Sequence, residues 1–236
     1  MSILKQPHNN KPREIVFKGE KFYRFPIQTH TIDVGEDIIP IIKNEIKDLD
    51  FDEAVLLIAE SALSASQKRI FKFSEIKFGF WAKFLSKFVT KTPAGIGLGT
   101  PQTMQLAINE VGLVRIIFAA AVSALSRPFV KGLFYKLVGE KARGIDGPTA
   151  NTIPPYNEYA SLIPANISEF VKKAEEEIGR KLKIIIIDAN DIGVNILDAR
   201  NKDEEELAQA LAFDNPLGQG SESTPFLLCT KVDLFQ

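Results

Sequence analysis

Residues 181–193, Lys-Leu-Lys-Ile-Ile-Ile-Ile-Asp-Ala-Asn-Asp-Ile-Gly, decide the fold of this chain. Four consecutive isoleucines, Ile184 to Ile187, place β-branched side chains on both faces, which predicts a central strand covered on both sides. We expect the chain to leave the sheet directly afterwards, at Asp188 to Asp191. Ligands of α/β folds bind at the carboxyl ends of strands, so these carboxylates are either turn formers or ligands for a hard cation.

Composition excludes several classes of protein. The 236 residues suffice for one large domain or two modest ones, and 45% hydrophobic residues, 25% charged residues and a formal net charge of −1 indicate a soluble globular protein. There is no basic excess that would favour nucleic acid as a partner. The lone Cys229 excludes an internal disulfide framework and is expected in the core. With a polar segment 1–13 in place of a signal peptide, the sequence predicts a cytoplasmic protein.

Charge and hydrophobicity are unevenly distributed along the chain. Residues 67–91 contain six lysines and one arginine against a single acid, Glu75, whereas 169–206 is rich in acids. Solvated helix faces are the ordinary explanation, and an anionic ligand near the basic part is the alternative. The most apolar segment, 116–125, falls short of the roughly 20 residues of a membrane span, so we expect a buried helix and no transmembrane segment.

The hydrophobic periodicity predicts an α/β (α+β) fold with mixed β-sheets, packed helices and a helical insertion in the middle of the chain. The predicted parts are a flexible tail over 1–13, an N-terminal α/β part over 14–92, the insertion over 93–143 and a C-terminal α/β part over 144–236. The predicted elements are a hairpin turning at 18–21, a helix over 38–46, a buried strand over 54–59, a helix over 78–89 that buries its aromatic side chains, a helix from 103 that breaks near Gly112, a helix capped by Ser168 that ends near Gly179, a helix over 204–213 and a last strand over 225–232.

Three polar stretches are candidates for chemistry. Segment 60–69 is rich in hydroxyl groups and ends in two cations, which could cradle a phosphate, although such residues are also common in ordinary loops. Segment 144–156 combines glycine and proline, which deny regular structure, with side chains that can bind a cation or phosphate oxygens. Segment 214–225 is a glycine-rich loop with further acceptors. The glycines of 95–99 match neither the dinucleotide fingerprint nor a Walker A loop, so we expect a tight connector there.

Three motifs in these stretches resemble, in matching order and at similar spacing, the signatures of the coenzyme F420-0:gamma-glutamyl ligase family. They are Gly144-Ile-Asp-Gly, Ile187-Asp-Ala-Asn and Leu217-Gly-Gln-Gly-Ser-Glu-Ser-Thr-Pro. The resemblance is good in the C-terminal third and looser at 25–37 and 64–69.

The resemblance implies a GTP-dependent amide ligase, which adds L-glutamate in gamma linkage to the carboxylate of coenzyme F420-0 through an acyl phosphate. It assigns Mg²⁺ or Mn²⁺ to Asp146 and Asp188, with Gln219 and Glu222 as further candidate ligands. Carboxylate-held metal is the usual means of positioning transferring phosphoryl oxygens. The candidates for nucleotide or substrate binding are Ser64, Ser66, Lys68, Arg69, Asn151, Asn190, Gly218, Gly220 and Ser221. No catalytic residue is assigned.

The chain departs from the family pattern at two places. Gln219 stands where the archaeal pattern tends to an acid, and a lysine and a glycine expected around 64–69 are replaced, which leaves Lys68 or Arg69 to supply the charge. Two alternatives therefore stay open: an amide ligase for a different carboxylate, and a non-catalytic nucleotide-binding or interaction protein of the same fold. The expected partners are small molecules and no nucleic acid, with a homodimer left open.

Overall fold

The chain folds into two compact units. The computed structural model describes residues 3–89, 97–126, 133–150, 152–190, 193–218, 220 and 222–235. Unit 1 comprises 1–68 and 164–236, and unit 2 comprises 69–163. The predicted helical insertion, 93–143, falls inside unit 2 together with segments on either side of it.

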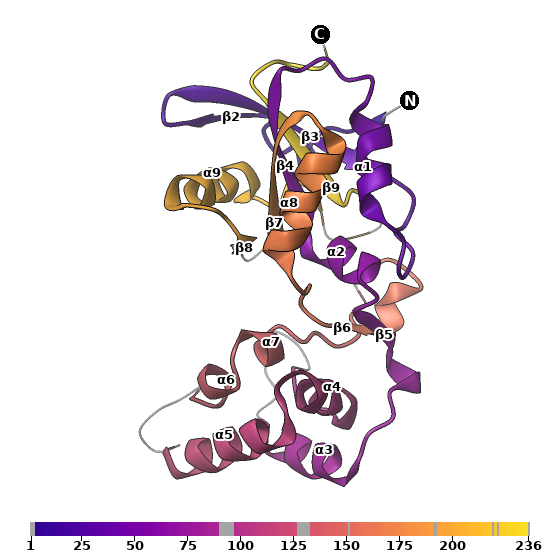
Figure 1. The fold of residues 1–236 in the computed structure, drawn as a ribbon, viewed down its shortest axis with the longest axis vertical. Helices are drawn as coiled ribbons and strands as arrows, with labels where there is room; N and C mark the ends of the chain where they lie inside the picture. Colours follow the sequence, from indigo (N-terminus) through magenta and orange to yellow (C-terminus); the bar gives the residue numbers. More distant parts are fainter. Residues whose placement is uncertain are drawn as a thin grey trace. The chain divides into compact units, whose positions relative to one another are not determined.

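Unit 1 is built on a seven-stranded mixed sheet with the order β1-β3-β9-β4-β7-β8, in which β2 pairs with β3 (Figure 1). The strands are β1 Ile3–Leu4, β2 Glu14–Phe17, β3 Glu20–Gln28, β4 Glu53–Ala59, β7 Lys181–Asn190, β8 Gly193–Asp198 and β9 Phe226–Thr230. Strands β4 and β7 are parallel, and the other pairings of the described strands are antiparallel. The predicted α/β fold with mixed sheets is confirmed.

The isoleucine strand β7 is buried as predicted. Ile184 to Ile187 are at most 2% exposed, and Ile184 lies opposite Leu56 of β4. The prediction that the chain leaves the sheet at Asp188 is wrong, because β7 continues to Asn190 and pairs with β8. This pairing gives the polar residues a strand partner, and the register shifts between Ile186 and Ile187, at the point where the apolar run meets them.

Helices cover both faces of this sheet (Figure 1). Alternate side chains of a strand point to opposite faces, and Leu57, Ile185 and Ile187 form one core cluster with helix α9, Lys202–Ala212. On the other face α8, Ile167–Ile178, packs against β7 and against α1, Ile38–Ile46. Cys229 lies in the α9-side core as predicted, and burial raises the pKa of its thiol to about 12.

Local signals explain where several elements begin and end. The predicted hairpin forms, and Lys18 and Gly19 at its turn both have positive φ, which matches the twist of the flanking strands. The predicted α1 begins after Asp37, whose carboxylate accepts from the Ile39 N–H. Gly179 ends α8 in the left-handed conformation.

Two local predictions are corrected by the structure. Helix α8 begins at Ile167, after Asn166, so Ser168 lies inside the helix and is not its N-cap. The Ser168 hydroxyl donates instead to the Asp198 carboxylate. Helix α9 begins earlier than predicted because Asn201 accepts from the Glu204 N–H and caps it. The hydroxyl-rich segment after β4 forms helix α2, Glu60–Ser66, whose Ala62 and Leu63 are buried.

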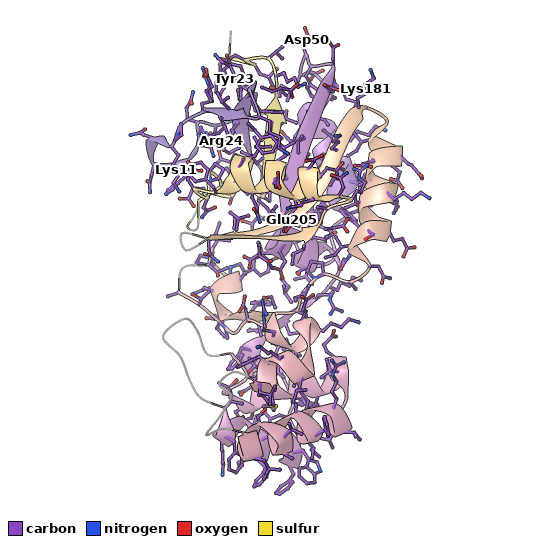
Figure 2. The ribbon with its side chains drawn as sticks, turned by 90° about the vertical axis from the view of Figure 1, so that its left-hand side faces the viewer. Lys11, Tyr23, Arg24, Asp50, Lys181 and Glu205 are labelled. Atoms are coloured by element: carbon purple, nitrogen blue, oxygen red, sulfur yellow. The ribbon has the colours of Figure 1, made fainter. Side chains whose placement is uncertain are left out.

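The N-terminal segment expected to be a flexible tail has structural partners. Strand β1 pairs with the end of β3, and a single 3-10 turn, His8–Asn10, follows it. The guanidinium of Arg24, which is fully buried, donates to Asp214 and to the carbonyls of Leu211 and Pro12. A buried guanidinium needs acceptors for its donors, so residues near 12 are held over β3. In the same segment Lys11, labelled with Arg24 in Figure 2, donates to the Asn215 carbonyl at 2.9 Å.

Unit 2 is a helical bundle with a small sheet. Its described elements are β5 Ile70–Lys72, α3 Phe80–Leu85, α4 Pro101–Val111, α5 Leu113–Ser126, α6 Leu133–Val138, α7 Glu140–Arg143 and β6 Tyr159–Ser161. Strands β5 and β6 pair antiparallel. The predicted break at Gly112 is present, with φ +86, and the residues of α4 and α5 on its two sides are bent by 113°. Within the described ranges no single helix is long and apolar enough to cross a membrane, although α4 and residues 113–125 of α5 together, as a bent pair, have the length and composition of a span.

The prediction that the helix over 78–89 buries its aromatic side chains is wrong. Phe80, Trp81 and Phe84 are 73%, 45% and 43% exposed. The core of unit 2 takes the other side of α3, where Ala82 and Leu85 are buried. Helix α5 is likewise buried on one side only, because Ile116 and Ala119 lie in the core whereas Phe118 is 60% exposed.

We predict that Arg24→Ala lowers the free energy of unfolding by about 3–5 kcal/mol, because it leaves Asp214 and two carbonyls without their buried donor. Urea denaturation followed by circular dichroism measures this loss. The matched control is Lys173→Ala, which removes a solvent-exposed ion pair with Glu177 and should change stability by less than about 0.5 kcal/mol. Equal stability of the Arg24 variant and the control would contradict this structural role.

Candidate functional site

The register of unit 1 brings four polar segments to one edge of its sheet. Ile27, Phe226, Ile58 and Ile186 lie in one row across β3, β9, β4 and β7. Beyond this row each strand meets a polar segment, and we call these together the carboxyl-edge site: 28–36, 60–68, 188–190 and 214–225. Asp50 and Lys181 mark the opposite end, where β4 and β7 begin (Figure 2).

The loop 214–225 is held in place by hydrogen bonds from its neighbours. Thr29 N–H donates to the Ser223 carbonyl at 2.9 Å, and Ala59 N–H donates to the Pro225 carbonyl at 2.9 Å. The Gln28 side-chain amide donates to the Glu222 carbonyl at 3.0 Å. The loop is therefore joined to the ends of both β3 and β4, which places it at the carboxyl-edge site.

The Glu222 carboxylate organises the glycines of this loop. One oxygen accepts from Gly220 N–H at 2.7 Å, and the other lies 2.9 Å from His8 Nδ1. The same carboxylate covers Gly218, where a Cβ would lie 2.8 Å from Glu222 Cδ and where φ is +82. The positive φ favours glycine at 218, and a larger residue there would displace the Glu222 carboxylate. In this arrangement Glu222, a predicted metal ligand, is engaged by groups of the protein itself.

Asp188 is the most chemically suggestive group of the site. It lies in β7 opposite Asn195, and burial raises the pKa of its carboxyl group. A desolvated carboxylate at the carboxyl edge of a sheet is a functional-site candidate, because a cation would offset the cost of its burial. Oxygen ligands of this kind suit Mg²⁺ or Mn²⁺. Nearby, the Asn190 side chain accepts from Gly193 N–H at 3.1 Å.

Lys68 ends the segment after β4. Its backbone is left-handed, with φ +59, and its N–H donates to the Ala65 carbonyl. Gly35 N–H donates to the same carbonyl at 2.8 Å, and the aliphatic stem of Lys68 lies over Gly35, so a larger residue at 35 would displace it. Of the predicted serines, Ser64 is fully buried, whereas Ser66 is half-buried.

His30 is paired with an acid in the segment 28–36. His30 Nε2 lies 2.8 Å from Glu36 Oε1, and Asp33 N–H donates to Glu36 Oε2 at 2.9 Å. The backbone hydrogen bond from Asp33, together with His30, lowers the pKa of Glu36. The contacts of Glu36 with His30 and Asp33 join the two ends of the turn that contains Gly35, the residue under the Lys68 side chain.

The other predicted site residues lie in unit 2 or outside the described residues. Asp146 exchanges backbone hydrogen bonds with Ser161, and Arg69 donates to Glu110 at 2.7 Å and to the Ile163 carbonyl at 2.6 Å. Asp146 and Asp188 belong to different units, so their joint metal site stays a prediction. The remaining predicted residues, Asn151, Gln219 and Ser221, lie outside the described residues. In the described part of the chain, no group of three or more His, Cys, Asp and Glu side chains is placed to hold a metal ion.

Sequence reasoning missed the contribution of the N-terminal segment. His8 N–H donates to the Pro216 carbonyl at 2.9 Å, and its ring pairs with Glu222. Nothing in the polar composition of 1–13 signals this role. The partner of this segment is a loop about two hundred residues away, and local periodicity carries no information on such contacts.

The comparison with protein families matches the region that contains most of this site. A model described as F420-0:gamma-glutamyl ligase matches residues 26–193, from the end of β3 to the start of β8. The match includes β4, all of unit 2 and the isoleucine strand with Asp188. No curated protein matches the chain significantly.

We predict that Asp188→Asn stabilises the metal-free protein at neutral pH. Burial raises the pKa of Asp188 in the folded protein, so protonation of this carboxyl group stabilises the fold. The stabilisation is complete below the pKa of an unfolded aspartate, about 3.9, and is lost as the pH rises through the pKa of Asp188 in the folded protein. Thermal melts across this range should show a higher melting temperature for the variant near about pH 7, with the difference disappearing toward about pH 4. A variant that is less stable throughout would show that Asp188 has a structural role in the strand.

We predict that His8→Ala loosens the loop 214–225 without unfolding the sheet. Removal of the ring takes one partner from the Glu222 carboxylate, so amide hydrogen exchange should rise in the loop while β4 and β7 keep their protection. Lys5→Ala, an exposed change in the same N-terminal segment, is the control. Identical exchange in the two variants would remove His8 from the support of the loop.

Proposed function

We propose, since this chain belongs to the F420-0:gamma-glutamyl ligase family, that it is a nucleotide-dependent amide ligase that joins L-glutamate to the carboxylate of coenzyme F420-0. The observation that carries the proposal is the family match over 26–193. It includes the desolvated Asp188, which follows the buried isoleucines of β7, and the Gly144-Ile-Asp-Gly motif. GTP is the proposed phosphoryl donor, and the compartment is proposed to be the cytoplasm.

The proposed reaction has two steps. An oxygen of the acceptor carboxylate attacks the γ-phosphorus of the nucleotide, the bond to the β-γ bridging oxygen breaks, and the nucleoside diphosphate leaves. The amine of L-glutamate then attacks the acyl phosphate, the amide bond forms, inorganic phosphate leaves and a proton is released. Each step moves charge onto phosphate oxygens, so catalysis by positioning and charge neutralisation suits this chemistry.

Asp188 and Asp146 are the groups proposed to hold the divalent cation. When bound, Mg²⁺ or Mn²⁺ would neutralise charge on the nucleotide phosphates. The raised pKa of Asp188 fits this role, because a carboxylate in a desolvated position gains most from a bound cation. Gln219 and Glu222 are further proposed ligands, and Glu222 would have to exchange its contacts with His8 and Gly220 for the metal.

The other residues of the proposed site bind and orient the substrates. Lys68, whose side chain is exposed, offers a charge-assisted hydrogen bond to a phosphate or carboxylate oxygen, and Ser66 and Asn190 offer neutral donors. Gly218 and Gly220 allow the backbone to approach a ligand closely. Arg69, Ser64, Asn151 and Ser221 complete the proposed set; Arg69 would keep its ion pair with Glu110 or exchange it for an anionic substrate.

One observation favours the alternative of a non-catalytic nucleotide-binding protein. The Glu222 carboxylate, which the proposed ligase would use near its substrates, already accepts from Gly220 and pairs with His8. A protein that had left catalysis would keep such an internal arrangement at no cost. A ligase for a different carboxylate is the other alternative, and the same assay separates all three.

We predict that the purified protein with GTP, Mn²⁺, L-glutamate and coenzyme F420-0 sustains GDP release over many turnovers only when both glutamate and the acceptor are present, whereas the acceptor alone allows at most one GDP per protein. Mass spectrometry should show the acceptor heavier by one glutamyl residue. GDP release with other carboxylic acids but not with coenzyme F420-0 would identify a different acceptor. Nucleotide binding without turnover of any acid would support the non-catalytic alternative.

We also predict that Asp188→Asn and Asp146→Asn each weaken Mn²⁺-dependent GTP binding by roughly 10- to 100-fold, because each removes a charge that a hard cation requires. Isothermal titration calorimetry measures the affinity. Asp52→Asn, an exposed change at the start of β4 and far along the strand from the site, is the matched control. Wild-type affinity in both site variants would refute the metal assignment.

A further inference from the structure

Helix α3 and the turn after it carry a row of exposed aromatic rings on unit 2. We call Phe80, Trp81, Phe84 and Phe88 the aromatic patch; they are 73%, 45%, 43% and 67% exposed. The rings contact one another: Phe80 and Phe84 are stacked at 6.1 Å, and Phe84 and Phe88 meet edge to face at 5.1 Å. The patch is therefore continuous, not a set of scattered surface residues.

The exposure of the patch follows from which side of α3 the core uses. Ala82 and Leu85 are buried in the core of unit 2, and the aromatic residues occupy positions three and four residues apart on another side of the helix. Helix α5 packs beside α3 (Figure 1). It has exposed apolar side chains of its own, among them Val114 and Phe118. A continuous group of exposed aromatic rings such as the patch marks a site of interaction.

Positive charge flanks the aromatic patch. Lys77, Lys83 and Lys87 are exposed on the same short segment, and on a helix Lys83 and Lys87 lie beside the stripe of Phe80 and Phe84. The single acid of 67–91 is Glu75, which lies 3.7 Å from Lys72. The aromatic patch is therefore flanked by a net positive charge, whereas helices α8 and α9 of unit 1 are rich in acids.

We propose that the aromatic patch and its lysines dock unit 2 onto an anionic lipid surface. Aromatic rings insert at the level of the lipid headgroups, and lysines with flexible stems reach the anionic phosphates while their apolar stems remain beside the rings. The docking is peripheral and goes beyond the proposed ligase reaction, which does not require it.

Two observations favour a lipid surface over a protein partner. In a symmetric dimer built on this patch, the lysines of one copy would face those of the other, with no acid on the patch to pair them. Interfaces between proteins are enriched in aromatic residues but depleted in lysine, whereas anionic membranes attract both. The lysines beside the aromatic patch therefore favour a lipid surface over a protein partner, whereas the aromatic rings alone would fit either.

Trp81 makes the test direct, because it is the one tryptophan of the sequence and lies within the patch. The full chain is titrated with vesicles of phosphatidylglycerol and phosphatidylcholine and, in parallel, with phosphatidylcholine alone. We expect a blue shift of Trp81 emission and quenching by brominated acyl chains with the anionic vesicles only. Binding should weaken as salt shortens the Debye length from about 10 Å at 0.1 M to about 3 Å at 1 M.

Two sets of variants separate charge from aromatic insertion. The triple change Lys77→Gln, Lys83→Gln and Lys87→Gln should weaken vesicle binding by roughly fivefold per lysine, about a hundredfold in total. The triple change Phe80→Ser, Phe84→Ser and Phe88→Ser retains Trp81 as reporter and should abolish the blue shift. The matched controls in unit 1 are Lys172→Gln with Lys173→Gln, and Phe213→Ser, which is 58% exposed in the wild type; both should bind as wild type does.

Several outcomes would overturn the proposal. They are equal binding to neutral and anionic vesicles, wild-type binding by the lysine variant, and no binding by the wild type. A dimer in sedimentation that the phenylalanine variant converts to a monomer would instead assign the patch to a second copy. The lysine variant changes only exposed side chains, so it decides the question even if the phenylalanine variant fails to fold.

Discussion

The parallel pairing of β4 and β7 is the constraint on which the rest of unit 1 depends. Both strands are buried along their apolar runs, and Leu56 opposite Ile184 fixes the register of the sheet core. A slip of one residue would exchange the side chains that face α9 with those that face α1 and α8. This pairing also decides which polar residues share an edge, because Ala59, the first residue after the buried run of β4, lies opposite Ile187, the last buried residue of β7. The candidate site is thus a consequence of sheet register as much as of the motifs themselves.

The same interaction explains why the central part of the fold was predictable. Four isoleucines permit few environments, and Asp37 and Gly179 are local signals with local partners. The aromatic helix was not predictable in this way. When a helix has apolar residues on two sides, its sequence predicts that one side is buried but does not identify which. In α3 the small Ala82 is buried in the core and the aromatic rings are exposed. Burial is a property of the neighbours, which the pattern of one segment does not contain.

For the site, the sequence offered candidate residues but not the groups that support them. The motif reasoning placed Asp188 directly after the buried isoleucines, and in the structure it follows Ile187 in β7. It did not foresee that β7 would continue past Asp188, nor that His8 would reach the Glu222 carboxylate. Such long-range partners depend on where the sheet brings the chain termini. Segment composition says nothing of that.

The chain enters and leaves unit 2 through neighbouring segments. Gln67 and Ala165 exchange two hydrogen bonds, of 2.8 and 2.7 Å, on the unit 1 side, and Leu162 N–H donates to the Arg69 carbonyl on the other. The two ends of this insertion are held together by these hydrogen bonds. Its length can therefore change with little effect on stability, because the entropic cost of closing a loop grows only logarithmically with loop length. Closure therefore tolerates changes in the length of the chain between residues 68 and 164. Unit 2 can lengthen or shorten while the register of the unit 1 sheet stays as it is, provided that it keeps its residues of the proposed site, Asp146 among them.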